Sequence, residues 1–167
     1  MSNLIKIDKE YADWIQSVGN RFKSTQIKAA RKVNQEMLYF YWLLGKDIVD
    51  MHAESRWGSK FYSSLSNDLA LAIPGQKSFS PTNLKYMTYF YQLYSEIRPQ
   101  PVDELCMVPW GHHRYIIDKC KGDAEKAIFY IRKTIENNWS IRNLHCGGKS
   151  YIENRYRQSH IRFAADN

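Results

Sequence analysis

Apolar residues recur at the spacing of an α-helix along nearly the whole chain, and few stretches show the alternation of a β-strand. The clearest stripe advances in steps of three and four and comprises Ile27, Ala30, Val33, Met37, Tyr41, Leu44 and Ile48. Because a stripe of this kind usually faces a core, we expect these residues to be buried. The periodicity predicts an all-α fold, namely one compact multi-helix domain.

Helix start and stop signals divide this pattern into segments. Asp8 can cap a first helix that reaches about Phe22, and Ser24 or Thr25 can open a longer one that ends near Glu54. A further helix over residues 59–73 stops at Pro74-Gly75. After residue 97, a proline-rich stretch predicts an ordered loop. Three shorter helices follow, over residues 110–120, 123–137 and 140–146.

Ser80-Pro81 is a strong helix start, because Ser caps well and Pro loses nothing at the first helical position. The helix from Pro81 to about Glu96 should bury Leu84, Met87, Tyr91 and Tyr94 and expose Thr82, Lys85, Tyr89, Gln92 and Glu96. Together with residues 59–73 it forms a helix-turn-helix-like pair, although the turn is longer than usual. A plain helical hairpin would give the same pattern.

The charge is unevenly distributed. There are 24 Lys+Arg and 17 Asp+Glu residues, a net charge of +7. Between residues 14 and 35 there is no acidic residue but five basic ones, Arg21, Lys23, Lys28, Arg31 and Lys32, and residues 141–167 hold a second basic cluster. Such clusters attract polyanions, although solvated helix faces also carry them.

The sequence carries no pattern typical of a membrane-spanning, secreted or metal-binding protein. The chain has no apolar run long enough for a membrane span and no signal-peptide pattern near its start, so we expect a soluble cytoplasmic protein. Three cysteines without paired spacing indicate reduced thiols. No finger-like spacing supports a zinc site at His112, His113, His145 and Cys146, and we expect neither metal nor cofactor.

Catalytic patterns are equally weak. An acidic residue followed at a distance by Glu-x-Lys, as a metal-dependent nuclease needs, is missing. A dyad of His112 with Cys106 or Cys120 is conceivable by residue type, but no spacing singles it out, and His112-His113 fits a structural role better. We therefore predict a segment without a catalytic site of its own.

A specific series of motifs runs from about residue 14 to 140. It comprises Tyr41-Trp42 with Gly45, Trp57-Gly58, LSNDL at 65–69, FSPTNLKYMTYFYQLY at 79–94, VPWGHH at 108–113, and FYI and NWS at 129 and 138. This order resembles the N-terminal domain of the YhcG-like family. The resemblance implies a helix-turn-helix type of domain, residues 1–148 here, usually followed by a PD-(D/E)XK nuclease domain that this chain has no room for. Residues 149–167 would be a basic tail or the start of a linker.

These observations predict a DNA-binding or target-recognition module for such a nuclease. The candidate contacts are Lys77, Ser80, Thr82, Asn83, Lys85, Tyr89 and Gln92 around the capped helix, with Arg21, Lys28, Arg31 and Lys32 adding phosphate contacts if they share its face. The alternative is an assembly module, in which aromatic residues such as Tyr39, Phe40, Tyr86, Tyr89 and Phe90 bind a protein or a second copy of the chain.

Overall fold

The computed structural model describes residues 9–97 and 102–147, and the regular structure in these ranges is entirely helical. The elements are α1 (Lys9–Asp50), α2 (Ala53–Trp57), α3 (Phe61–Ala72), α4 (Pro81–Ser95), α5 (Val102–Cys106), α6 (Trp110–Cys120), α7 (Ala124–Asn137) and α8 (Ile141–Gly147). The prediction of an all-α fold is confirmed.

The two N-terminal helices expected from the sequence are one continuous helix, α1. Ser24 and Thr25 lie inside it, and the Thr25 hydroxyl donates to the Arg21 carbonyl oxygen at 2.9 Å. A Thr hydroxyl that bonds back by four residues is compatible with a helix interior, so these residues did not have to act as caps. The predicted cap Asp8 lies outside the described residues. At its other end α1 stops at Asp50, and His52 turns the chain with φ 49°.

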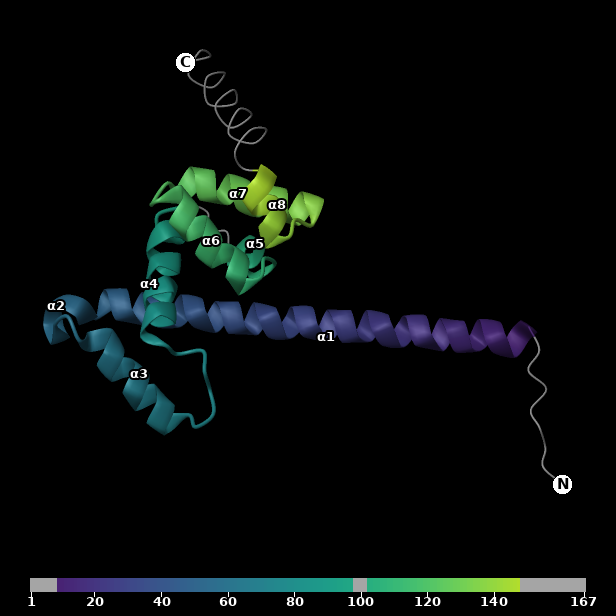
Figure 1. Ribbon diagram of the computed structural model, residues 1–167, viewed down its shortest axis with the longest axis horizontal. Coiled ribbons are helices and arrows are strands. Elements are labelled where there is room, and N and C mark those ends of the chain that lie inside the picture. Colours follow the sequence, from purple (N-terminus) through teal and green to yellow (C-terminus); the bar gives the residue numbers. More distant parts are fainter. Residues whose placement is uncertain (1–8, 98–101, 148–167) are drawn as a thin grey trace, which may run out of the picture.

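The two halves of α1 differ in their surroundings (Figure 1). Residues 9–33, here called the arm, project from the other helices, and every residue from 12 to 33 is exposed. The remaining described residues form the body. Ile27 and Val33 belong to the arm and are 54% and 65% exposed, so the expectation that they line a core was wrong. Within the body, Tyr41 and Ile48 of the same stripe are buried, as expected.

The body is built around the crossing of α1 and α4 (Figure 1). Gly45 lies at this crossing, where a Cβ atom would stand 2.1 Å from the Met87 carbonyl oxygen. Only a residue without a side chain permits that approach of two backbones. Gly45 therefore fixes how closely the two helices pack.

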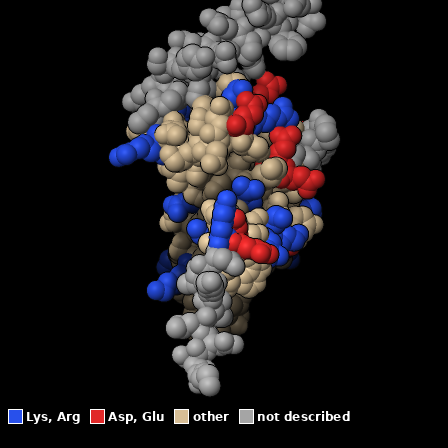
Figure 2. All heavy atoms as spheres, turned by 90° about the vertical axis from the view of Figure 1, so that its right-hand side faces the viewer, with Lys and Arg blue, Asp and Glu red and all other residues tan. Residues whose placement is uncertain are grey.

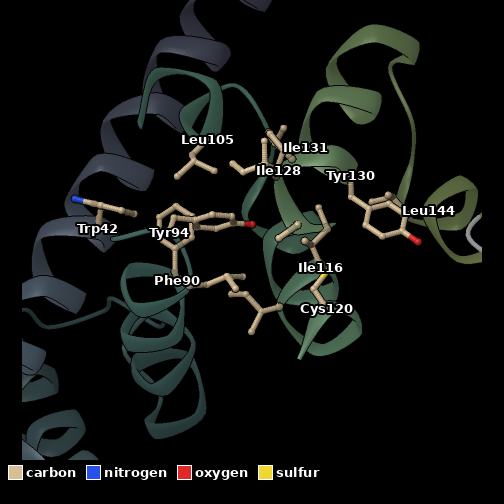
Figure 3. Close-up of a cluster of buried hydrophobic side chains, with 14 residues drawn as sticks. Trp42, Phe90, Tyr94, Leu105, Ile116, Cys120, Ile128, Tyr130, Ile131 and Leu144 are labelled. Carbon is tan, nitrogen blue, oxygen red and sulfur yellow. The ribbon is translucent and has the colours of Figure 1, made fainter. Parts of the chain in front are cut away.

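Two groups of buried side chains form the core, and α4 contributes to both. One joins α1 to α4 and α5–α8 and includes Trp42, Phe90, Tyr94, Leu105, Ile116 and Ile131 (Figure 3). The other joins α1 to α2–α4 and α5, and comprises Leu38, Tyr41, Ile48, Ala53, Tyr62, Phe79, Leu84, Met87 and Cys106. α4 is therefore the central helix of the body.

The structure after residue 101 differs from the prediction. Residues 102–106 form the short helix α5 in what was expected to be a loop. The stretch between Pro101 and Pro109 is free of proline and carries Asp103 and Glu104 in the first turn, which favours a helix start. The three later helices are confirmed within a residue or two, and the Asp123 side chain caps α7 by accepting from the Lys126 amide.

Two other expectations concern the C-terminal tail and membrane crossing. The predicted tail over residues 149–167, with most of the second basic cluster, lies outside them. Within the described ranges, no helix combines the length and the apolar character that crossing a bilayer would require.

Candidate nucleic-acid interface

The start of α4 follows the sequence prediction. Ser80 is the N-cap, and its hydroxyl oxygen accepts a hydrogen bond from the Asn83 amide at 3.3 Å. Pro81 occupies the first turn, and Lys77 is exposed in the preceding loop. Ser80 itself is exposed, and the positive end of a helix dipole favours an anion.

One face of α4 is exposed along its length. Thr82, Lys85, Tyr89 and Gln92 are all exposed, while Leu84, Met87 and Tyr94 are buried on the other side. This division is the one that helical periodicity predicts, except that Tyr91, which was expected to be buried, is only half-buried. A hydroxyl, an ammonium, a phenol and an amide on one face can all hydrogen-bond to a phosphate or a base edge.

Asn83 has a structural part that the sequence did not reveal. Its side-chain amide donates to the Ser78 carbonyl oxygen at 2.6 Å, and its own oxygen accepts from the Trp110 indole N–H at 2.8 Å. The side chain is half-buried. These bonds tie the loop before α4 to the start of α6, so Asn83 positions the helix and is not placed to contact a ligand.

The Lys85 side chain lies over an aromatic ring of α3. Its ammonium lies 5.5 Å from the centre of the Tyr62 ring, within the range of a cation–π contact. The Tyr62 hydroxyl donates to the Thr88 hydroxyl at 3.1 Å, and Thr88 in turn donates to the Leu84 carbonyl oxygen. Burial raises the pKa of Tyr62 to about 12, so this hydroxyl stays protonated. The charge of Lys85 is thus held near α4 while remaining exposed.

The exposed face of α4 continues onto α6 through aromatic rings. The rings of Tyr89 and Tyr86 meet edge to face at 6.3 Å, and the Arg114 guanidinium lies 4.7 Å from the Tyr86 ring centre. The Tyr86 hydroxyl donates to the two Asp118 carboxylate oxygens at 2.7 and 2.9 Å. That hydrogen bond raises the pKa of Tyr86. Arg114 therefore lies beside the α4 face, which sequence reasoning did not foresee.

A shallow, open hollow of about 420 Å³ lies where α4 meets the end of α6. Tyr89 and Gln92 line it from α4, and Lys121 and Gly122 line it from the turn after α6. Lys121 has φ 49°, so the turn holds its backbone in the left-handed region. We call the surface formed by Lys85, Tyr89, Gln92, Arg114 and Lys121 the α4–α6 surface. Two of its three cations come from α6 and the following turn and have no signal in the local sequence pattern.

The predicted cations of α1 are elsewhere. Arg21, Lys28, Arg31 and Lys32 are exposed on the arm. At the rise of an α-helix, Arg21 lies about 36 Å and Lys32 about 20 Å along α1 from Gly45, where α4 crosses. The Lys32 ammonium also pairs with Glu36 at 2.7 Å. The two groups of candidate residues therefore do not form one site, and any partner shared by both must be extended.

Figure 2 views the molecule from the free end of the arm. Lys and Arg side chains are spread over several places on this side, with Asp and Glu side chains between them. The positive charge is therefore distributed over the molecule and does not form one continuous patch on this face.

The residues of the conceivable cysteine–histidine dyad are either buried or close to a backbone carbonyl oxygen. Burial raises the pKa of Cys106 to about 11 and that of Cys120 to about 12, so both remain thiols near neutral pH. The ring Nε2 of His112 lies 2.8 Å from the Trp139 carbonyl oxygen. His113 is fully buried, with its Nε2 2.8 Å from the Leu105 carbonyl oxygen, and burial lowers its pKa to about 4.

Comparison with known proteins places the chain in a family. No curated protein and no solved structure gives a significant match. A family model described as the DUF1016 N-terminal domain matches residues 17–155, which is most of the chain. That match covers the arm from residue 17 onward, the crossing at Gly45 and the α4–α6 surface. The chain belongs to the DUF1016 N-terminal domain family, the N-terminal region of YhcG-like proteins.

Proposed function

We propose that this domain is a DNA-binding module, with the α4–α6 surface as its primary contact. The observation that carries the proposal is that the exposed polar face of α4 lies beside cations of α6 and its following turn. Arg114 packs on the Tyr86 ring, and Lys121 lines the same hollow as Tyr89 and Gln92, together with Asp118. Three exposed cations, an aromatic ring and an amide on adjacent helices match the residue types that bind phosphates and base edges.

In this proposal α3 and α4 act as a helix-turn-helix-like pair. Residues 73–80 connect them, a longer connection than the three or four residues of the standard turn. α4 would be the helix that meets DNA, since its capped N-terminus and its polar face are both exposed. The module would recognise or position DNA for a nuclease domain of the PD-(D/E)XK type elsewhere in the protein, and it would act in the cytoplasm.

The arm supplies a second, more distant set of phosphate contacts. Arg21, Lys23, Lys28 and Arg31 form no ion pair with any residue in the described part of the chain. Because they lie tens of ångströms from α4, they would grip the duplex backbone at a different place and carry no sequence information.

The experiment is a salt titration of duplex DNA binding. Each phosphate contact contributes a slope of about −0.9 in log affinity against log salt. Lys85→Gln and Arg114→Gln should each weaken binding and reduce the size of the slope by about one. Lys46→Gln is the matched control, since it removes the same charge from α1, where Lys46 pairs with Asp50.

Three results would contradict the proposal in different ways. If the unmodified chain does not bind duplex DNA at low salt, the proposed function is wrong. If Lys46→Gln weakens binding as much as Lys85→Gln does, the effect comes from net charge and the α4–α6 surface is not the contact. If replacing Arg21, Lys28 and Arg31 together by Gln leaves the slope unchanged, the arm has no part in binding.

A further inference from the structure

The arm exposes more apolar surface than a helix in water normally does. Trp14, Ile15, Val18 and Phe22 are 37–63% exposed, and Val33 is 65% exposed. Helices in proteins owe most of their stability to an apolar face that packs against something. Among the described residues, no other helix packs against this face of the arm, so the face is available to a partner.

The apolar residues of the arm follow a coiled-coil spacing. Tyr11, Ile15, Val18, Phe22, Thr25 and Ala29 are separated alternately by four and three residues, which places them in one line on the helix. Thr25 fits this line because its hydroxyl already donates to the Arg21 carbonyl oxygen and would need no other partner when covered. Trp14 and Val33 flank the line, and Ile27 lies off it.

The order of side-chain sizes along this line selects an orientation. If a second arm runs antiparallel, about a two-fold axis near Asn20, Tyr11 meets Ala29, Ile15 meets Thr25 and Val18 meets Phe22. Each layer then combines a larger with a smaller side chain, and the width of the interface is even. A parallel pair would place Phe22 on Phe22 and Ala29 on Ala29, which alternates crowding with gaps.

Charge selects the same orientation. Glu10 and Asp13 are near the free end of the arm, whereas Arg21, Lys23, Lys28, Arg31 and Lys32 occupy the half nearer the body. An antiparallel pair brings the acidic end of one arm to the basic half of the other, and of the cations between residues 21 and 32 only Arg21, beside the axis, then lies close to its own copy. A parallel pair would align the cations of one arm with the same cations of its copy, which is repulsive.

We propose that the arm is a dimerisation element, in which two copies of this chain pair their residues 9–33 as an antiparallel coiled coil. With the axis near Asn20, residue 9 of one arm meets residue 31 of the other, so the paired stretch would be about 34 Å long. Covering two aromatic and several aliphatic side chains on each arm removes on the order of 1,200 Å² from solvent, the lower end of what specific protein interfaces bury. The two bodies then extend from opposite ends, and their α4–α6 surfaces stay clear of the paired helices.

The proposed interface is on the arm and not at the aromatic residues that were expected from the sequence. Of the residues expected to form it, Phe90 is buried in the core and Tyr86 bonds to Asp118, while Tyr39, Phe40 and Tyr89 are exposed on the body. The proposed interface instead uses Tyr11 and Phe22 of the arm, with Trp14 beside it.

Salt separates this association from DNA binding. Residues 9–33 hold six Lys and Arg and two Asp and Glu, so each arm carries 6 − 2 = +4. The arms repel at long range, and salt screens that repulsion. Salt also screens the attraction between the acidic end of one arm and the basic half of the other, so dimerisation should depend only weakly on salt, whereas DNA binding weakens steeply as salt rises.

The first test is sedimentation equilibrium of the full chain over a range of protein concentrations. We expect a monomer–dimer equilibrium for the unmodified chain and an association weakened by more than about 100-fold in the Val18→Glu/Phe22→Glu double variant. Leu71→Glu on α3 is the matched control, because Leu71 is 80% exposed and outside the arm, and its dimerisation should be unchanged. Thermal unfolding of the body should be the same in all three proteins.

The second test is disulfide cross-linking, which reports orientation. A mixture of Tyr11→Cys and Ala29→Cys chains should form a cross-linked heterodimer, and neither variant alone should cross-link through its new cysteine, since like positions lie about 27 Å apart in the antiparallel pair. A chain that remains monomeric at high concentration and high salt overturns the proposal. Self-cross-linking of Tyr11→Cys, or loss of the dimer in Leu71→Glu, overturns the antiparallel arm pairing.

Discussion

The two halves of α1 have the same secondary structure and opposite surroundings. From residue 34 to Asp50 the helix packs on α2, α4 and α5, and Leu38, Trp42 and Gly45 are buried. From Lys9 to residue 33 it is exposed nearly throughout. Both halves carry apolar residues at helical spacing. An apolar stripe therefore shows that a helix has a face to cover, but it does not show whether the same domain covers it.

The difference has consequences for energetics and function. The body half contributes to stability through close packing, of which Gly45 against Met87 is the tightest point. The arm half contributes little to the stability of the body because it touches little of it. It is instead available for a second copy of the chain or for a duplex.

The largest expected contrast between the halves comes from truncating one apolar side chain in each. Leu38 is fully buried, and Leu38→Ala should lower the free energy of unfolding by about 2–5 kcal/mol. Val33→Ala, only five residues away but exposed, should change it by less than about 0.5 kcal/mol. Urea unfolding of both variants measures this. Similar losses in the two variants would show that residue 33 is packed in solution and would move the boundary of the arm.

The loss of folding stability at acidic pH should arise from a buried histidine of the body. Burial lowers the pKa of His113 to about 4 in the folded protein, against about 6.5 in the unfolded chain. The unfolded chain takes up this proton first, so the contribution of His113 to stability is present above pH 6.5 and is lost as the pH falls towards 4. The loss over that window is about 3 kcal/mol.

The check is urea unfolding at several pH values for the unmodified chain and for His113→Gln, which keeps a donor near the Leu105 carbonyl oxygen. The variant should lose less stability between pH 6.5 and 4 than the unmodified chain does. Val33→Ala, which removes no ionisable group, is the control and should keep the pH dependence of the unmodified chain. Equal pH dependence in all three proteins would exclude His113 as the cause.

Replacing a glycine of α1 by alanine should be destabilising in the body half and slightly favourable in the arm. Gly45→Ala places a methyl group 2.1 Å from the Met87 carbonyl oxygen and should cost about 1–3 kcal/mol. Gly19→Ala meets no atom within 4 Å, and alanine is the better helix former by about 1 kcal/mol, so it should raise helix content slightly. Circular dichroism and urea unfolding detect both effects. A stable Gly45→Ala protein would mean that the α1–α4 crossing is looser than the structure shows.

The smallest contrast concerns two serines. Ser80→Ala removes the cap of α4 and should destabilise the body by about 1 kcal/mol. Ser24→Ala lies in the middle of the arm and should be neutral or slightly favourable, because alanine has the higher helix propensity. Thermal unfolding of the two variants side by side measures this difference. If Ser24→Ala destabilised the protein, the continuous helix through residue 24 would be in doubt.

Sequence patterns predicted the local parts of the structure well. The cap at Ser80, the faces of α4 and the helices after Trp110 follow from signals within a few residues of each other. The break expected at Ser24 was wrong because a hydroxyl that can cap a helix can also bond back inside one. The short helix α5 was missed because the prolines on either side of it dominate the pattern.

The candidate site was predictable only in part. The exposure of Thr82, Lys85, Tyr89 and Gln92 follows from periodicity. Asn83 was assigned to the ligand although it bonds to Trp110, a partner 27 residues away. Arg114 and Lys121 were missed because they come beside α4 only when α6 folds back on it.

The sequence by itself determined that this chain is helical, where most of its helices lie and which faces of them are apolar, because helix formation depends on bonds between residues four apart. Only the tertiary structure decided which apolar faces are covered. α4 crosses α1 at Gly45, so the stripe is buried on one side of residue 34 and exposed on the other. Burial depends on elements that are distant in the chain, and for that reason the arm and the α4–α6 surface emerged only from the fold.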